Sequence, residues 1–143
     1  VAGNGQDELL AALSGAARSG AGMIRLAGDE IGALSPDARR ARGLMTAPEE
    51  RLGHAAAPDM SLTENTVLTG KAQRRLVQGG MVDWAAAEHF AAEIIEAFDV
   101  RTPGTGSAAR ALSGGNLQKF VIGREMLQNP RVLVVNQPTC QRN

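Results

Sequence analysis

The chain has 143 residues, the size of a single domain, and 43% of them are hydrophobic, which is enough to form a buried core. Its 15 basic and 15 acidic residues give a formal net charge of zero. This balance argues against nucleic acid as the main partner, because binding to a phosphate backbone normally needs a basic surplus. The single cysteine, Cys140, cannot form an internal disulfide, so a reducing compartment is expected. No apolar run approaches the roughly 20 residues that span a bilayer, and the first residues lack the pattern of a signal peptide. We therefore expect a soluble protein or the soluble part of a membrane assembly.

The first third of the chain predicts short helices alternating with strands. A helix is expected over 7–17 and a strand over 23–27. Ser35 and Pro36 begin a short basic helix, because Ser is a good cap and Pro is tolerated in the first helical turn. A second strand is expected over 43–47.

The remainder predicts a mostly helical part that ends in a strand. The S-x-x-E pattern over 61–64 is a capping box and opens a helix, and a loop with a basic cluster is expected over 70–80. The strongest amphipathic pattern lies over 82–98. A loop rich in Pro, Gly and Ser leads to a further helix, which Pro130 ends. The apolar strand over 131–135 is of the continuous kind expected when both faces are buried.

The most informative motif is the Leu-Ser-Gly-Gly-Asn sequence over 112–116, at the start of this last helix. Ser113 can cap the helix, and the two glycines that follow let a ligand approach the bare backbone. Free N–H groups at a helix start, with the positive end of the helix dipole behind them, form a phosphate site. The motif therefore predicts contact with a phosphate group.

The first residues resemble a degenerate phosphate-binding loop. In the pattern G-x-x-x-x-G-K-[ST], Gly5 fits the last glycine, but Gln6 occupies the Lys position and Asp7 the Ser/Thr position. These changes remove the charge that neutralises phosphate and replace a hydroxyl ligand of Mg²⁺ with a carboxylate. A plain Gly-rich turn between a strand and a helix would give the same pattern.

The strand over 131–135 and the polar residues after it resemble a Walker B motif, in which an active ATPase has Asp and then Glu where this chain has Asn136 and Gln137. An amide is a poor Mg²⁺ ligand beside a carboxylate and cannot act as a base at neutral pH. We therefore predict no catalytic residue at these two positions. His54 and His89 are isolated, so the sequence predicts no metal site. A plain core strand followed by a turn is the alternative interpretation of residues 131–137.

Taken together, these motifs resemble the second, degenerate nucleotide-binding domain of the ATP-binding subunit of a simple-sugar or nucleoside ABC importer, present as a fragment. The resemblance implies an α/β fold: a partial P-loop NTPase core of ABC type, with mostly parallel strands and a helical signature subdomain. It also implies a P-loop and core part over 1–51, a helical subdomain over 52–127, and a Walker B strand with a truncated end over 128–143. Five motifs carry it: Ala2 to Gln6, Pro48 to Arg51, Met60 to Asn65, Leu112 to Asn116, and Asn136 to Thr139.

The resemblance also implies which residues contact nucleotide. Glu49 stands at the Q-loop, which senses the γ-phosphate and contacts the membrane subunit. Family members pair head to tail, so that the signature of one domain caps the γ-phosphate of ATP held by the Walker A motif of the other. The implied nucleotide-binding residues are Gly3, Asn4, Gly5, Gln6, Asp7, Glu49, Ser113, Gly114, Gly115 and Asn116.

The implied function is that of an ATP-binding domain in sugar or nucleoside uptake. Its signature would complete the partner's ATP site, while this domain alone would not be catalytically active. ATP and Mg²⁺ would be bound mainly at the partner domain's site. The implied partners are a second nucleotide-binding domain, transmembrane permease subunits and, indirectly, a solute-binding protein, at the cytoplasmic face of the membrane.

Three other functions are left open. The chain could be an ABC-like interaction module that docks on a permease without binding nucleotide. A non-transport ABC ATPase that acts on DNA or ribosomes fits the neutral charge poorly. An independent ATPase conflicts with Gln6, Asn136 and Gln137. We also expect an incomplete parallel sheet with exposed edges and a tendency to self-associate.

Overall fold

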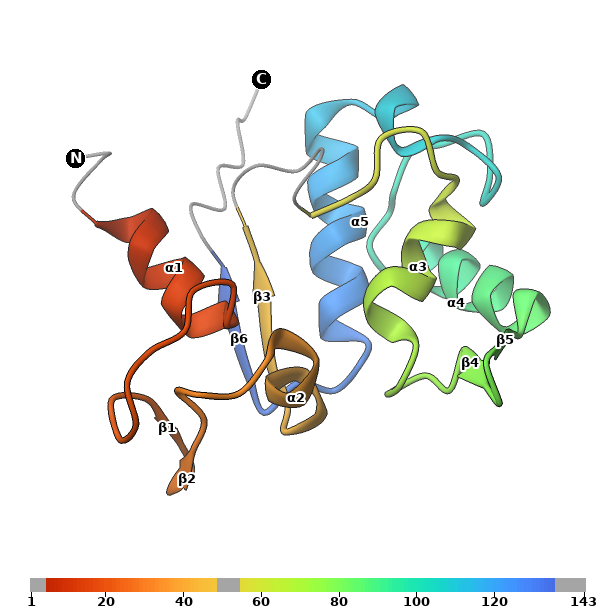
Figure 1. Ribbon diagram of the computed structural model, residues 1–143. Coiled ribbons are helices and arrows are strands. Elements are labelled where there is room, and N and C mark those ends of the chain that lie inside the picture. Colours follow the sequence, from red (N-terminus) through yellow and green to blue (C-terminus); the bar gives the residue numbers. More distant parts are fainter. Residues whose placement is uncertain (1–4, 49–54, 136–143) are drawn as a thin grey trace.

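The computed structural model describes residues 5–48 and 55–135 (Figure 1). A pair of parallel strands, β3 (Leu44–Ala47) and β6 (Val132–Val135), forms the centre. Helices α1 (Gln6–Ser14), α2 (Pro36–Ala41) and α5 (Gly114–Met126) all contact β3. In Figure 1, α5 stands between this strand pair and a group of further helices. The parallel pair flanked by helices confirms the expected α/β class.

The N-terminal helix is shorter than the expected 7–17. It ends at Ser14 because Gly15 adopts a left-handed conformation, with φ of 87°, and donates its N–H to the carbonyl of Ala11. Arg39 of α2 is 1% exposed and donates to the carbonyls of Leu13 at 2.8 Å and Gly32 at 2.6 Å. The bond to Leu13 satisfies a carbonyl group that the end of α1 would otherwise leave without a partner.

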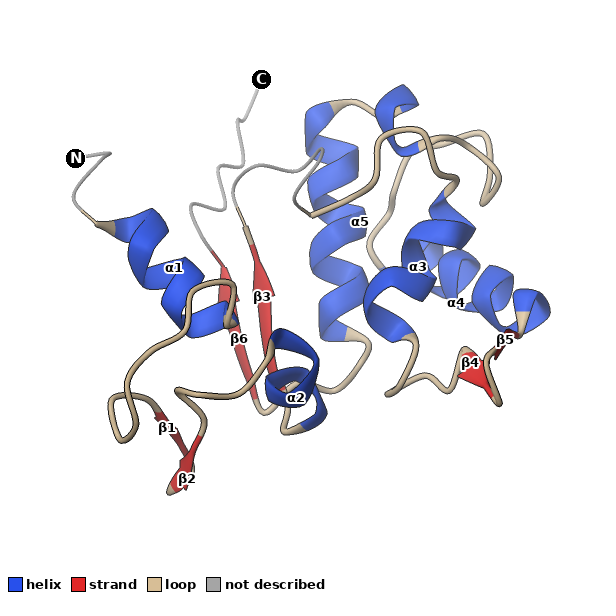
Figure 2. Ribbon diagram, viewed as in Figure 1, coloured by secondary structure: helices blue, strands red, loops and turns tan. Residues whose placement is uncertain are grey.

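Two hairpins that the sequence did not predict lie where a strand and a loop were expected. The strand expected over 23–27 is only β1 (Arg25–Leu26), which pairs with β2 (Asp29–Glu30) in an antiparallel hairpin. The loop expected over 70–80 contains β4 (Val77–Gln78), which pairs with β5 (Met81–Val82). In both hairpins the two turn residues have positive φ, which suits the twist of a two-residue turn. Figure 2 shows both hairpins lying apart from the central pair.

The predicted capping box is confirmed at the start of α3 (Leu62–Gly70). The Ser61 side chain accepts from the Glu64 N–H at 3.1 Å, and the Glu64 carboxylate accepts from the Ser61 N–H at 2.7 Å. The hydrogen bonds from Ser61 hold the pKa of Glu64 below its ordinary value. The amphipathic helix is α4 (Trp84–Ala97), with Asp83 as its cap. A short 3₁₀ turn, Ala109–Ala111, then precedes α5.

The main hydrophobic core lies among α3, α4 and α5, which contact one another. Phe90 and Ile94 of α4 and Phe120 of α5 are at most 1% exposed. Gly123 lies where a Cβ would be 2.6 Å from Phe98, so α4 and α5 approach closely at this glycine.

The expectation that the last strand is buried on both faces is wrong. Val132 is 41% exposed, and the other residues of β6 are only partly buried. Among the described strands, β6 pairs with β3 alone, in register from Leu44 opposite Val132 to Ala47 opposite Val135. A strand with one neighbour and incomplete cover retains exposed apolar side chains, although its sequence is continuous and β-branched.

Candidate functional site

The N-terminus of α5 presents the signature residues at the surface. Ser113 is the N-cap, with extended backbone angles, and its hydroxyl oxygen accepts from the N–H of Asn116 at 3.4 Å. Ser113, Gly114 and Gly115 are all exposed. A Cβ built on Gly115 would have no protein atom within 4 Å, so the space beside it is open.

This end of α5 suits an anion held from outside the chain. The N–H groups of Gly114 and Gly115 are in the first helical turn, where they have no acceptor within the helix. The helix dipole adds positive potential at the same place, and the first turn contains no acidic residue. Hydroxyl and N–H donors therefore converge on an open surface, as phosphate binding requires.

Both ends of the Asn116 side-chain amide form hydrogen bonds with other residues of this chain. Its Nδ2 donates to the Ser113 hydroxyl at 2.9 Å, and its Oδ1 accepts from the N–H of Arg101 at 2.9 Å. One turn further along, Lys119 donates to the carbonyl of Asp99 at 2.8 Å. The signature is thus tied at two points to the segment that follows α4. The sequence placed Asn116 among the nucleotide-binding residues but gave no sign of these contacts.

The second predicted site lies at the start of α1. Gly5 is left-handed, with φ of 78°, and precedes the helix as its N-cap without a side-chain cap bond. Gln6 and Asp7 occupy the exposed first turn, and Asp7 and Glu8 place negative charge where phosphate would approach. Other predicted positions lie outside the described residues: Gly3, Asn4, Glu49, Asn136 and Gln137.

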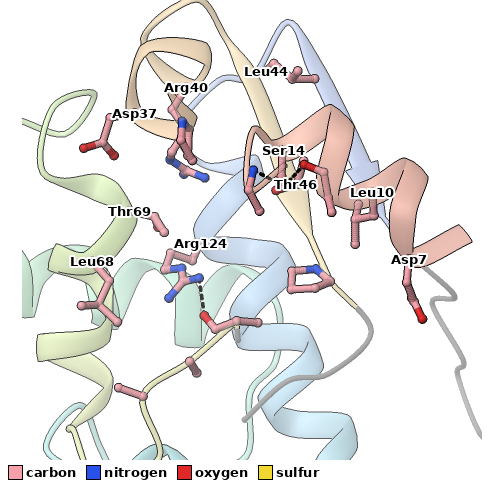
Figure 3. Close-up of a pocket in the computed structure, with 17 residues that line it drawn as sticks. Asp7, Leu10, Ser14, Asp37, Arg40, Leu44, Thr46, Leu68, Thr69 and Arg124 are labelled. Atoms are coloured by element: carbon pink, nitrogen blue, oxygen red, sulfur yellow. Dashed lines mark hydrogen bonds between the residues drawn. The ribbon is translucent and has the colours of Figure 1, made fainter. Parts of the chain in front are cut away.

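The structure contains a cavity of about 1180 Å³ between α1, α2, β3 and α3 (Figure 3). Of the described site residues, Asp7 lines it, whereas none of residues 113–116 does. The structure therefore does not bring the two predicted helix starts into one pocket. In Figure 3 the guanidinium groups of Arg40 and Arg124 lie along the cavity, with Thr69 nearby.

A largely buried polar network forms part of the cavity wall, near the C-terminal end of α5. Arg124 is 2% exposed and donates to the carbonyls of Ala55 at 2.7 Å and Asn65 at 3.0 Å, and to the Glu125 carboxylate at 2.9 Å. Burial lowers the pKa of Arg124, and the neighbouring Glu125 opposes that effect. Arginine nevertheless stays protonated, because its ordinary pKa is so high.

Glu125 connects three helices. Its carboxylate, which is buried, pairs with Arg40 of α2 and with Arg124, and accepts from the Thr69 hydroxyl of α3 at 3.0 Å. Among the described side chains, the Nε atom of Arg40 is buried without a hydrogen-bond partner. The sequence did not predict this network. Its only signal was a charged pair, Arg124-Glu125, inside an otherwise apolar helical run.

Asn65 fixes the segment beside this network. Its side chain accepts from the N–H of Ala57 at 2.8 Å and donates to the carbonyls of Ala57, Met60 and Ser61 at distances of 3.1 Å or less. The amide is 0% exposed, so these bonds replace all of its contacts with water. Asn65 and Arg124 together therefore hold the backbone of 55–57 against α3 and α5.

Over residues 5–48 and 55–135, no cluster of three or more His, Cys, Asp or Glu side chains could hold a metal ion. In the same ranges, no helix is both long and apolar enough to cross a bilayer.

The strand pair, the helical part and the exposed signature helix define an ATP-binding cassette, and sequence comparison agrees. The chain belongs to the ABC transporter family, whose sequence profile matches residues 2–140. It is 37% identical over 139 residues to the guanosine import ATP-binding protein NupO of Bacillus subtilis, covering 97% of this chain and 27% of that protein. It is 36% identical over 139 residues to the ribose import ATP-binding protein RbsA 1 of Rubrobacter xylanophilus, covering 97% of this chain and 28% of the relative.

The fold agrees with solved cassettes. A dimeric structure of the ATP-binding cassette MJ0796, in a post-hydrolysis state with ADP and Pi, superposes with a TM-score of 0.67. That match has 18% sequence identity and covers 97% of this chain and 58% of the cassette. The chain thus spans about a quarter of the length of the curated relatives named above, at 27% and 28%.

Proposed function

We propose that this chain is a degenerate nucleotide-binding domain of an importer for a sugar or a nucleoside, and that its signature completes an ATP site on a second domain. One observation carries the proposal. The signature over 113–116 is intact and its Ser113, Gly114 and Gly115 are exposed, whereas Gln6, Asn136 and Gln137 replace the charged or catalytic residues of this chain's own site. The names of the import relatives support the transport role.

In this proposal the second domain holds ATP and Mg²⁺, and this chain supplies hydrogen-bond donors. The Ser113 hydroxyl and the N–H groups of Gly114 and Gly115 donate to the γ-phosphate oxygens. Because these donors are already in place, they stabilise the charge of phosphoryl transfer without reorganising. This chain alone does not hydrolyse ATP, since Gln6 lacks the Lys charge and Gln137 cannot polarise water as a carboxylate does.

The same proposal places the chain at the cytoplasmic face of a membrane, beside permease subunits that a solute-binding protein serves. The helical part over 52–127 would dock on the permease, with Glu49 at the Q-loop. The dimeric solved cassette supports pairing with a second nucleotide-binding domain. The core over 1–51 and the strand segment over 128–143 would hold the helical part in place.

The test is a Ser113→Arg variant in the assembled transporter. Arginine adds bulk at the open helix start, so we expect ATP hydrolysis to fall at least about 100-fold, by analogy with removal of an oxyanion donor. Arg110→Ala, three residues upstream in an exposed ion pair, is the matched control and should leave hydrolysis unchanged.

Unchanged hydrolysis in the Ser113→Arg variant would overturn the composite site and favour the interaction module. Measurable ATP turnover by this chain alone would contradict the claim that its own site is inactive.

A further inference from the structure

The hydrogen bonds around Ser113 fix more than the start of a helix. A serine hydroxyl has two acceptor positions and one donor hydrogen. The Ser113 oxygen accepts from both the N–H and the side-chain Nδ2 of Asn116, at 3.4 Å and 2.9 Å. Among the described residues, Ser113 donates to no acceptor. Both acceptor positions are therefore occupied from one side, and the hydroxyl hydrogen is directed away from Asn116.

The side chain of Asn116 is fixed in turn by the segment that follows α4. Its Oδ1 accepts from the N–H of Arg101, and Arg101 follows Val100, which is 5% exposed in the main core. The Val100 N–H donates to the carbonyl of Ile95 at 3.0 Å, which ties this segment to the end of α4. The orientation of the Asn116 amide is thus set by backbone that packs in the core.

We propose that Asn116 is a positioning residue that aims the Ser113 hydroxyl at the γ-phosphate of the second domain's ATP. The inference rests on the proposed function and deepens it. Asn116 does not touch the nucleotide in this scheme, because both ends of its amide are already engaged within the chain. It acts through Ser113, by occupying the acceptor positions of the hydroxyl and leaving its hydrogen free to donate.

The asparagine side chain supplies both an acceptor for the N–H of Arg101 and a donor to the Ser113 hydroxyl oxygen. Alanine offers neither the acceptor for Arg101 nor the donor for Ser113. Aspartate keeps the acceptor but cannot donate when ionised, and it adds negative charge beside the phosphate position. An Asn116→Asp variant therefore separates the tether to Arg101 from the aiming of Ser113.

The experiment is a double-mutant cycle in the assembled transporter, with steady-state ATP hydrolysis as the readout. We expect Ser113→Ala and Asn116→Ala each to lower kcat about tenfold or more, as loss or misplacement of a preorganised donor does. The KM for ATP should change less than about twofold, because Walker A of the second domain binds the nucleotide. The double variant should be no slower than Ser113→Ala alone, since Asn116 acts only through that hydroxyl.

The control is Lys119→Ala, which removes the other tether between α5 and the segment after α4. It should leave kcat unchanged, because Lys119 does not contact Ser113. If Asn116→Ala fails to fold, Asn116→Asp replaces it in the cycle. Its kcat should fall at least as much, and that loss should be smaller in the Ser113→Ala background, where only the effect of the added charge remains.

The possible outcomes separate the two proposals. Unchanged kcat in Ser113→Ala would overturn the composite site itself. A reduced kcat in Ser113→Ala with additive losses in the double variant would leave the composite site standing and overturn the positioning role. An equal loss in Lys119→Ala would also overturn it, because the effect would then come from the tether to the loop and not from the hydroxyl.

Discussion

At the scale of single residues, Gly123 shows how packing can override helix propensity. Replacing Gly with Ala inside a helix normally gains about 1 kcal/mol. Here the added Cβ would lie 2.6 Å from Cδ2 of Phe98 and 3.0 Å from Ile94, which is too close without movement. We expect Gly123→Ala to lower the free energy of unfolding by about 1–3 kcal/mol, as overpacking does. Denaturant unfolding of the chain would measure this change.

A second substitution makes the prediction specific. Phe98→Ala should cost less stability in the Gly123→Ala background than in the parent chain, because it removes the Cγ and Cδ2 atoms that lie nearest the new methyl group. A Gly123→Ala variant that is more stable than the parent chain would contradict the packing argument.

Single residues also show which contacts could be predicted from the sequence. Ser35, Ser61 and Ser113 were expected to cap helices, and all three do. Caps depend on a few adjacent residues, so a local pattern is enough to predict them. The amide of Asn116 was not predicted to bond to Arg101, because that contact depends on how α4 and α5 pack.

At the scale of elements, Glu125 holds α2, α3 and α5 together through a buried charge. Replacing it with Gln would leave the buried Arg124 and the half-buried Arg40 without their carboxylate. Loss of one partner of a buried ion pair costs about 3–5 kcal/mol, and we expect a loss of this size for Glu125→Gln. Thermal or denaturant unfolding would measure it.

An exposed ion pair in the same region is the matched control. Lys71 and Asp37 pair at 2.7 Å with side chains 46% and 65% exposed, and they join α2 to the end of α3. Asp37→Asn should cost no more than about 1 kcal/mol, because water already solvates both groups. Equal losses in the two variants would argue against a special role for the buried carboxylate.

Among the elements that the structure describes, the sequence located every helix longer than a single turn and both strands of the central pair. It missed the two small hairpins because each strand has only two residues, too few for a periodic pattern. It also misjudged the burial of β6, since an apolar run indicates a strand but not how many neighbours the strand has. The buried network was missed for a related reason: periodicity cannot tell which third element meets a charged pair.

At the scale of the whole molecule, the free edge of β6 bears on how the chain behaves in solution. Among the described strands, β6 is paired on one side only, and Val132 is 41% exposed. Such an edge is a template for pairing with another chain. We expect self-association at high protein concentration and a marked reduction of it by Val132→Lys, measured by sedimentation at several concentrations.

Met81→Lys is the control for that experiment. Met81 is 77% exposed but lies in the β4–β5 hairpin, away from the central pair (Figure 1). The two variants add the same charge, so only Val132→Lys should reduce association if the edge is responsible. A chain that stays monomeric, with a sharp thermal unfolding transition, would contradict the expectation.

The pairing of β3 with β6 also has a consequence for the order of folding. These neighbouring parallel strands enclose the whole segment from Pro48 to Arg131, and the described part of that segment has its own core among α3, α4 and α5. Closing so long a loop costs entropy before the strand contacts can form. We therefore expect the helices, whose contacts are more local, to collapse first and bring the ends of the two strands together. On this expectation the signature helix forms before the central strand pair, and that pair is among the last parts of the molecule to form.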